Sequence, residues 1–212
     1  MLDDPPPALI FILISCKNNS SLVIDSLCDE ALGQNIGVAC LYCDFLSQRE
    51  QDTTSLVGGL LKQFVVGLGE IPDVVDQAFQ DARRGVGGRS PHLPQMLNLF
   101  SMILSFFHRA FICVDALDEL LLEHRIKLLR SLHQIMQNSP NVRFFLTGRP
   151  HIREEIERYL TKSPYIIAIQ PRQEDIKNYL TMRLDDDPYP YAMDDDLKLE
   201  IIKNIPQSLS EM

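Results

Sequence analysis

Short continuous apolar runs alternate along this chain with longer segments in which apolar residues recur every three or four positions. Apolar runs of four to eight residues are typical of buried strands in a parallel sheet, whereas the wider spacing is typical of amphipathic helices. The expected strands are residues 9–15, 36–45, 109–115, 141–147 and 164–169. This alternation predicts an α/β domain whose parallel strands are joined by right-handed crossovers.

Eight segments between and after these runs carry the helical pattern. The expected helices are residues 20–33, 52–68, 71–84, 93–108, 122–138, 151–160, 173–184 and 197–204. The expected helix caps are Ser20 or Ser21, Asp52 or Thr53, and the run Asp194–Asp196, whose side chains can accept a hydrogen bond from a first-turn amide. In segment 122–138 a single face is expected to be buried, at about 1.5–3 kcal/mol per side chain; it holds Leu122, Ile126, Leu129, Leu132 and Met136. We therefore expect a three-layer, doubly wound sheet of about five strands with a short helical C-terminal extension.

Length and composition are those of a globular chain with one substantial core. The chain has 212 residues, of which 45% are hydrophobic and 23% charged, enough to bury a core of ordinary size. We expect a divergent N-terminus with the first strand over residues 1–19, an α/β core over 20–170, and the start of a helical region over 171–212.

Net charge and hydropathy limit the classes of partner that the chain is expected to bind. A net charge of −9 argues against broad binding to nucleic acid or to anionic membranes, because both depend on basic patches. The apolar run at residues 8–14 is too short to cross a bilayer. The five cysteines are irregularly spaced, and the CxxC of Cys40 and Cys43 has no second pair with which to hold zinc. We expect buried free thiols and a cytoplasmic protein.

Three carboxylates come within five residues where the strand at 109–115 ends: Asp115, Asp118 and Glu119. Ligands of open α/β sheets bind beyond the carboxyl ends of the strands, and carboxylates there suit Mg²⁺ or an attacking water. Arg149 follows the next strand and could face a phosphate. Alongside a phosphate cradle, the set would suffice for phosphoryl transfer, with Asp115 holding Mg²⁺ through water and Asp118 or Glu119 orienting the nucleophile. The alternative is that the acids favour a helix dipole and that the arginine pairs with a carboxylate.

Residues 111–119 (FICVDALDE) resemble the Walker B segment of NACHT-type P-loop NTPases, and residues 144–150 (FFLTGRP) resemble their sensor strand with its terminal arginine. Residues 170–180 and 187–190 resemble the segments after the sensor strand in the fungal branch with a nephrocystin-like N-terminal domain, whose members often continue into ankyrin or similar repeats. The resemblance runs from about residue 20 to the end. It implies a P-loop NTPase-like fold in a STAND-type signalling NTPase, with Mg²⁺ and ATP or GTP as ligands. In that family pattern Asp115 is the metal-binding position, and Arg149 contacts nucleotide as well as serving catalysis.

The chain departs from the family pattern at the phosphate loop. The family places GxxxxGK and then Ser or Thr between the first strand and the first helix, but residues 14–19 here read ISCKNN, and no glycine precedes Gly33. Residues 20–25 match the helix that comes after the loop. Ser20 and Lys17 are the candidates for nucleotide contact, Lys17 only if the register of the loop is shifted. Side chains obstruct the closing of backbone N–H groups around phosphates, so we expect impaired nucleotide binding.

The sequence therefore leaves two hypotheses about the function of this chain. The first is a NACHT-like module that exchanges Mg-ATP or Mg-GTP as a switch, with weak or absent NTPase activity. The second is a non-catalytic remnant of the same fold that acts as a protein-interaction domain, through self-association or other protein partners. A generic α/β hydrolase or dehydrogenase is disfavoured, because no GxSxG, GxGxxG or paired Cys/His arrangement is present.

Overall fold

The chain separates into two compact units, residues 1–168 and 169–212. The computed structural model describes residues 10–14, 20–48, 50–84, 91–161, 164–168, 172–187 and 193–210. The first unit holds the sheet and the second holds two helices, and each is described by itself.

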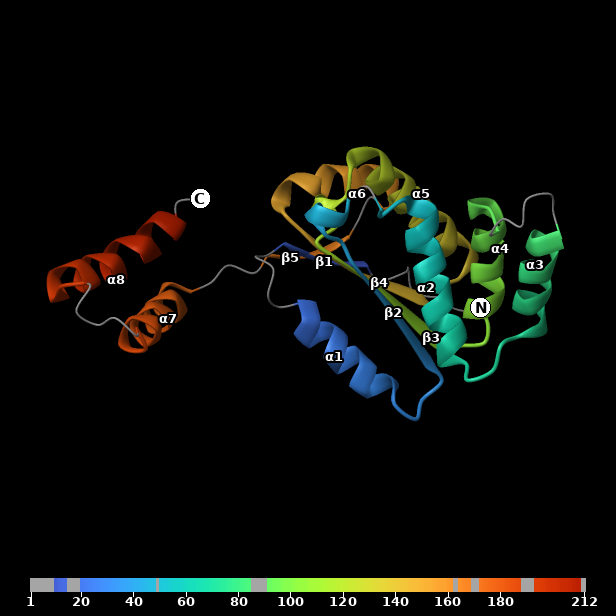
Figure 1. The fold of residues 1–212 in the computed structure, drawn as a ribbon, viewed down its shortest axis with the longest axis horizontal. Helices are drawn as coiled ribbons and strands as arrows, with labels where there is room; N and C mark the ends of the chain where they lie inside the picture. Colours follow the sequence, from blue (N-terminus) through green and yellow to red (C-terminus); the bar gives the residue numbers. More distant parts are fainter. Residues whose placement is uncertain are drawn as a thin grey trace, which may run out of the picture. The chain divides into compact units, whose positions relative to one another are not determined.

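Five parallel strands form the sheet of the first unit, in the spatial order β2-β3-β4-β1-β5 (Figure 1). The strands are β1 (Ile10–Ile14), β2 (Ile36–Tyr42), β3 (Arg109–Asp115), β4 (Val142–Gly148) and β5 (Tyr165–Ala168). Because every neighbouring pair is parallel, the carboxyl ends of the strands lie along one edge of the sheet. The predicted α/β class with a parallel sheet is confirmed.

Strand register fixes which residues meet at that edge. Tyr42 at the end of β2 is level with Asp115 at the end of β3, and Ile14 at the end of β1 is level with Gly148 at the end of β4. The end of β1 therefore lies beside the end of β4, and β4 separates it from Asp115 at the end of β3.

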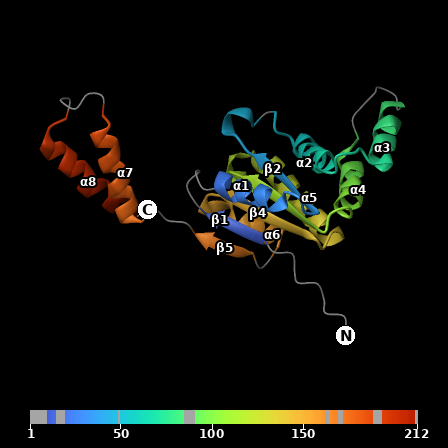
Figure 2. The ribbon, with the colours of Figure 1, turned by 90° about the horizontal axis from the view of Figure 1, so that it is seen from below.

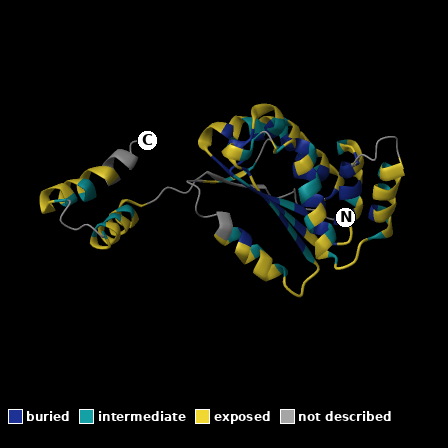
Figure 3. Cartoon of the chain, in the orientation of Figure 1, coloured by how far each residue is buried: buried dark blue, intermediate teal, exposed yellow. Residues whose placement is uncertain are grey.

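Helices cover both faces of the sheet (Figures 1 and 2). Helix α1 (Ser20–Ala31) lies on one face, and α2 (Thr53–Gly67), α4 (Leu93–Leu104) and α5 (Leu122–Asn138) lie on the other. The principal core lies between the sheet and this second group of helices, and Figure 3 shows buried residues gathered there. Its largest fully buried side chains include Phe64, Phe100, Phe144, Leu60, Ile103 and Ile112. Of the two predicted caps of α2, Asp52 is the observed one, because its Oδ1 accepts a hydrogen bond from the Ser55 N–H at 2.8 Å.

Two glutamine side chains bind the backbone of β2 and of Asp44 just after it, and β2 is one of the two edge strands of the sheet. The Gln63 carboxamide accepts from the Cys40 N–H at 2.9 Å and donates to the Cys40 carbonyl at 2.8 Å. The Gln51 carboxamide donates to the Tyr42 carbonyl and accepts from the Asp44 N–H, both at 3.1 Å. An edge strand otherwise presents unpaired N–H and C=O groups, so both side chains take the place of a neighbouring strand.

Three sequence-based expectations need correction. The strand predicted over 36–45 ends at Tyr42, because Asp44 caps a short 3-10 helix, η1 (Phe45–Ser47), by accepting from the Leu46 N–H. The helix predicted over 93–108 ends at Leu104. The buried face of α5 is rotated from the predicted one: Leu122 is 55% exposed, and the buried residues are Arg125, Leu128, Leu129, Ser131, Leu132 and Ile135.

The second unit consists of α7 (Gln173–Asp185) and α8 (Asp195–Ser210), which pack on each other. Asp194 caps α8, because its Oδ1 accepts from the Leu197 N–H at 2.8 Å. No side chain of α7 is buried, so this unit has no core of its own among its described residues. Within the part of the chain that the structure describes, no helix is long and apolar enough to cross a membrane.

Candidate functional site

Asp115 lies at the carboxyl end of β3 and is held by Thr147 from the end of β4. The Thr147 hydroxyl donates to Asp115 Oδ1, and the Ala116 N–H donates to the Thr147 oxygen at 2.9 Å. The side chains of Ala110, Ile112 and Val114 belong to the principal core, so alternation along β3 directs Asp115 to the face that α1 covers. The threonine therefore fixes the position and orientation of the carboxylate.

The backbone turns sharply directly after Asp115. Ala116 has φ 52° and ψ 44°, the left-handed conformation, and is the one residue other than glycine with positive φ among the described residues. This conformation costs an L-residue roughly 1–2 kcal/mol. The Thr147 hydrogen bond to the Ala116 N–H holds the turn, which opens the short 3-10 helix η2 (Leu117–Glu119). Strain of this kind clusters at functional sites.

Asp118 and Arg149 form an ion pair with each other. Asp118 Oδ2 lies 3.3 Å from Arg149 Nε, and Asp118 Oδ1 accepts from the Arg149 N–H at 3.2 Å. The Asp118 side chain is 7% exposed, whereas the Arg149 side chain is 67% exposed. The structure thus brings together two residues to which the sequence assigned separate roles, and it matches the alternative in which Arg149 pairs with a carboxylate.

Gly148 separates Thr147 from Arg149 at a point where no side chain fits. A Cβ atom there would lie 2.3 Å from Ile152 Cδ1 and 3.2 Å from Asp118 Oδ1. Ile152 is 1% exposed, which leaves it little room to withdraw. The glycine therefore allows β4 to approach η2 and η3 (Pro150–Ile152) closely.

Gly148→Ala is expected to lower the free energy of unfolding by about 1–3 kcal/mol, because the added methyl group overpacks this contact. Urea denaturation measures the loss. Gly67→Ala is the matched control, since a Cβ there would meet only Phe107 Cζ at 3.9 Å. Equal stabilities of the two variants would contradict this account of Gly148.

Glu119 is a buried carboxylate that holds η1. Its side chain accepts from the Phe45 N–H at 3.1 Å, and its backbone carbonyl accepts from the Gln48 carboxamide. The residue is 7% exposed. These bonds join the segment after β2 to the segment after β3, so Glu119 positions the loops around Asp115.

Arg125, which is paired with Glu155, binds the backbone at Asp118 and Leu120. The sequence pattern identified neither Arg125 nor Glu155 as a functional residue. Arg125 Nε and Nη2 donate to the two Glu155 carboxylate oxygens at 2.6 and 2.9 Å. Arg125 Nη1 donates to the carbonyls of Asp118 and Leu120 at 3.2 and 2.9 Å. An arginine on the apolar side of an amphipathic helix was the available signal. Its partner lies on α6 (Arg153–Tyr159), which no local pattern identifies.

The described cysteines are Cys28, Cys40, Cys43 and Cys113, and all are free thiols. Burial raises the pKa of Cys43 to about 12, and the neighbouring carboxylates of Asp115, Glu119 and Asp118 add to the shift. Burial also raises the pKa of Cys113 to about 12. These two thiols stay protonated at neutral pH and are poor nucleophiles. The predicted buried free thiols are confirmed at Cys43 and Cys113, while Cys28 is exposed.

Two predicted nucleotide contacts remain, Lys17 and Ser20. Lys17 lies outside the described residues, and Ser20 is the first residue of α1. Among the described residues, no group of three or more His, Cys, Asp or Glu side chains could hold a metal ion by itself. The described residues therefore supply at most two such side chains to a metal ion at Asp115. This matches how Mg²⁺ is held beside nucleotides, through one or two carboxylates with phosphates and water supplying the other ligands.

Sequence comparison places these residues in a known family. The family model described as nephrocystin 3, N-terminal, matches residues 19–149, which is more than half of the chain. The chain belongs to the nephrocystin 3 N-terminal family. The matched range runs from the residue before α1 to Arg149, so this family membership covers Asp115, Asp118 and Glu119 and excludes Lys17. No curated protein matches the chain significantly.

Solved structures with a similar fold include a Walker-type ATPase. The Walker-type ATPase PABY2304 of Pyrococcus abyssi is 12% identical with a TM-score of 0.52, over 96% of this chain and 60% of that one. A chain of Drosophila ORC bound to DNA is 14% identical with a TM-score of 0.54, over 95% of this chain and 47% of that one. At these identities the likeness concerns the fold alone. This nephrocystin 3 N-terminal family chain spans 60% or less of the length of either protein.

Proposed function

We propose that this domain is the nucleotide-binding module of a cytoplasmic, STAND-type signalling NTPase, with weakened affinity for Mg-ATP or Mg-GTP. The observation that carries the proposal is the Asp115–Thr147 pair at the ends of β3 and β4, beside the end of β1. In a parallel α/β sheet this edge is where phosphate-bearing ligands bind. Membership of the nephrocystin 3 N-terminal family and the P-loop ATPase-like fold support the same conclusion.

The metal half of such a site fits the residues present. Asp115 would hold Mg²⁺, which would neutralise charge on bound phosphates. Thr147 fixes the carboxylate, and the buried Glu119 fixes the flanking loops. Arg149 is largely exposed beside Asp118 and could turn toward a phosphate by leaving that ion pair.

The part of the site that would bind phosphates lacks the residues that such a site needs. Backbone N–H groups enclose phosphates most readily where glycines let the chain approach closely, and the segment from Ile14 to Asn19 has no glycine. We infer that affinity is lost here and that the metal-side residues persist.

A second candidate function is a non-catalytic interaction domain. The observation that favours it is that the acids at η2 already have structural partners, Asp118 on Arg149 and Glu119 on the Phe45 N–H. In this role the carboxylates would stabilise the loops of the sheet edge, and protein partners would replace nucleotide as the ligand.

Thermal unfolding with and without millimolar Mg-ATP or Mg-GTP tests the weakened affinity. A ligand at a hundredfold excess over its Kd stabilises by about 2.7 kcal/mol, which corresponds to roughly 5–10 °C in Tm for a chain of this size. We expect a shift far smaller than this. A full shift that disappears in Asp115→Asn and in Arg149→Ala would show that the native loop binds phosphate after all.

A further inference from the structure

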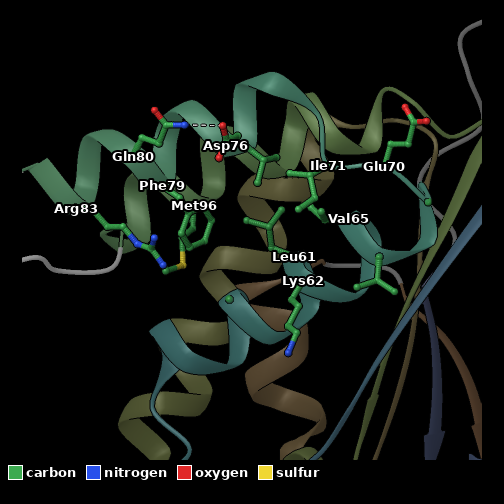
Figure 4. A pocket seen from close by; sticks show the side chains of 14 residues that line it. Leu61, Lys62, Val65, Glu70, Ile71, Asp76, Phe79, Gln80, Arg83 and Met96 are labelled. Carbon is green, nitrogen blue, oxygen red and sulfur yellow. Dashed lines mark hydrogen bonds between the residues drawn. The ribbon is translucent and has the colours of Figure 1, made fainter.

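Helices α2, α3 (Asp73–Arg84) and α4 line a groove that shares no lining residue with the candidate nucleotide site. Its volume is about 580 Å³, and its floor includes the buried side chains of Leu61, Val75 and Met96. Figure 4 shows these helices with the lining side chains as sticks. Within α3 only Val75 is buried, so this helix leaves most of its surface, including apolar side chains, uncovered. We call this feature the α3 groove.

Large apolar side chains line the α3 groove and remain open to solvent. Val66 is 69% exposed, Ile71 is 68% exposed and Phe79 is 41% exposed. Gly58 adds depth, because a Cβ atom at that position would meet only Met96, at 3.6 Å. Neighbouring exposed apolar side chains around a groove mark a site of interaction.

Charges of both signs border the α3 groove and occupy different parts of it. In Figure 4, Arg83 and Lys62 lie toward the left and the bottom of the groove, whereas Asp76 and Glu70 lie toward its top and its right, Glu70 beyond Ile71. Asp76 stands with Gln80, whose carboxamide donates to it at 2.6 Å. No ion pair joins Lys62 or Arg83 to another residue within the described part of the chain.

The charge pattern of one α3 groove is complementary to that of a second copy of the same groove. When a surface meets a copy of itself across a two-fold axis, each residue i that contacts residue j is matched by j contacting i. Antiparallel apposition of two α3 grooves would set the cations of one against the acids of the other. A ligand with a single anionic group would be attracted by Lys62 and Arg83 but repelled by Glu70 and Asp76. A second copy of this chain uses all four charges.

We propose that two copies of this protein associate through their α3 grooves about a two-fold axis. Ile71, Phe79 and Val66 of each copy become buried against the other, and the Lys62–Arg83 side of one groove faces the Glu70–Asp76 side of its partner. Complementary charges set the register of such a contact. This interface leaves the sheet edge at Asp115 uncovered.

Sedimentation velocity of the full chain over a wide concentration range tests the proposal. Salt of about 0.15 M screens the general repulsion between two chains of net charge −9 beyond about 8 Å. We expect concentration-dependent dimers. Phe79→Asp should raise the dissociation constant at least about tenfold, as truncation of a central aromatic contact does. Leu46→Asp is the matched control, because Leu46 is 91% exposed and lies in η1, and it should dimerise like the native chain.

Two charge-reversed chains make the test specific for this arrangement. Lys62→Glu with Arg83→Glu gives a wholly acidic groove, and Glu70→Lys with Asp76→Lys gives a wholly basic one. Each is expected to be monomeric alone, and their mixture is expected to form heterodimers, which also shows that both variants are folded. The proposal is overturned if the native chain is monomeric throughout, if Phe79→Asp dimerises normally, or if the mixture of reversed chains stays monomeric.

Discussion

Arg125→Leu is expected to lower the free energy of unfolding by up to about 3–5 kcal/mol, the cost of breaking a fully buried ion pair from one side, because the Arg125 side chain is buried although that of Glu155 is 22% exposed. Arg125 is 7% exposed and makes a two-pronged contact with Glu155. Its loss leaves the Glu155 carboxylate without its partner. It also removes the donor to the carbonyls of Asp118 and Leu120. Urea denaturation followed by circular dichroism gives the change directly.

Two controls separate these contributions. Arg153→Leu removes an exposed ion pair to Glu157 and should cost well under about 1 kcal/mol, as exposed pairs do. The double variant Arg125→Leu, Glu155→Leu removes both charges and should recover part of the loss, while the two carbonyls stay without their donor. If Arg125→Leu costs no more than Arg153→Leu, Arg125 does not anchor the acidic segment.

A glycine-rich phosphate loop is expected to restore nucleotide binding to this domain. In the variant, a GxxxxGKS sequence replaces residues 15–19 ahead of Ser20, so that backbone N–H groups and a lysine can meet phosphates at the end of β1. Mg-ATP or Mg-GTP at a hundredfold excess over Kd should then stabilise the domain by about 2.7 kcal/mol. Thermal unfolding with and without nucleotide measures the gain.

The matched control carries the same loop with alanine in place of its lysine, which keeps the glycines but removes the phosphate-binding cation. Asp115→Asn in the restored chain tests the metal side, and it should abolish the magnesium-dependent part of the gain. If the restored loop binds no nucleotide although the variant folds, the rest of the site is also damaged. The interaction-domain function would then be favoured.

Local pattern was sufficient for most of the fold, because burial in a parallel sheet demands continuous apolar runs. The bounds of α5 agree with its predicted range of 122–138. Its buried face differed because Leu122 begins the helix directly after η2 and points to solvent, while Arg125 occupies the inner face. The spacing of apolar residues predicts that leucine is buried in preference to arginine. Here Arg125 is buried because the Glu155 carboxylate on α6 pairs with it.

The candidate site was less accessible to sequence reasoning. Spacing identified the acids that come after β3, because chemistry at a strand end requires them within a few residues. It could not show that Asp118 pairs with Arg149, that Glu119 binds the Phe45 N–H, or that Thr147 orients Asp115. Each of these contacts joins segments about 30 or more residues apart, and each depends on strand order.

The glutamines that bind β2 also determine how this domain can meet other proteins. A foreign strand can extend a sheet only where backbone N–H and C=O groups are available. Along β2 it would have to displace Gln63 from Cys40, and Gln51 from Tyr42 and Asp44, losing four hydrogen bonds before forming its own. Both glutamines therefore disfavour edge-to-edge aggregation of this domain through β2. A partner that binds at β2 must recognise side chains, since the backbone groups there are already hydrogen-bonded.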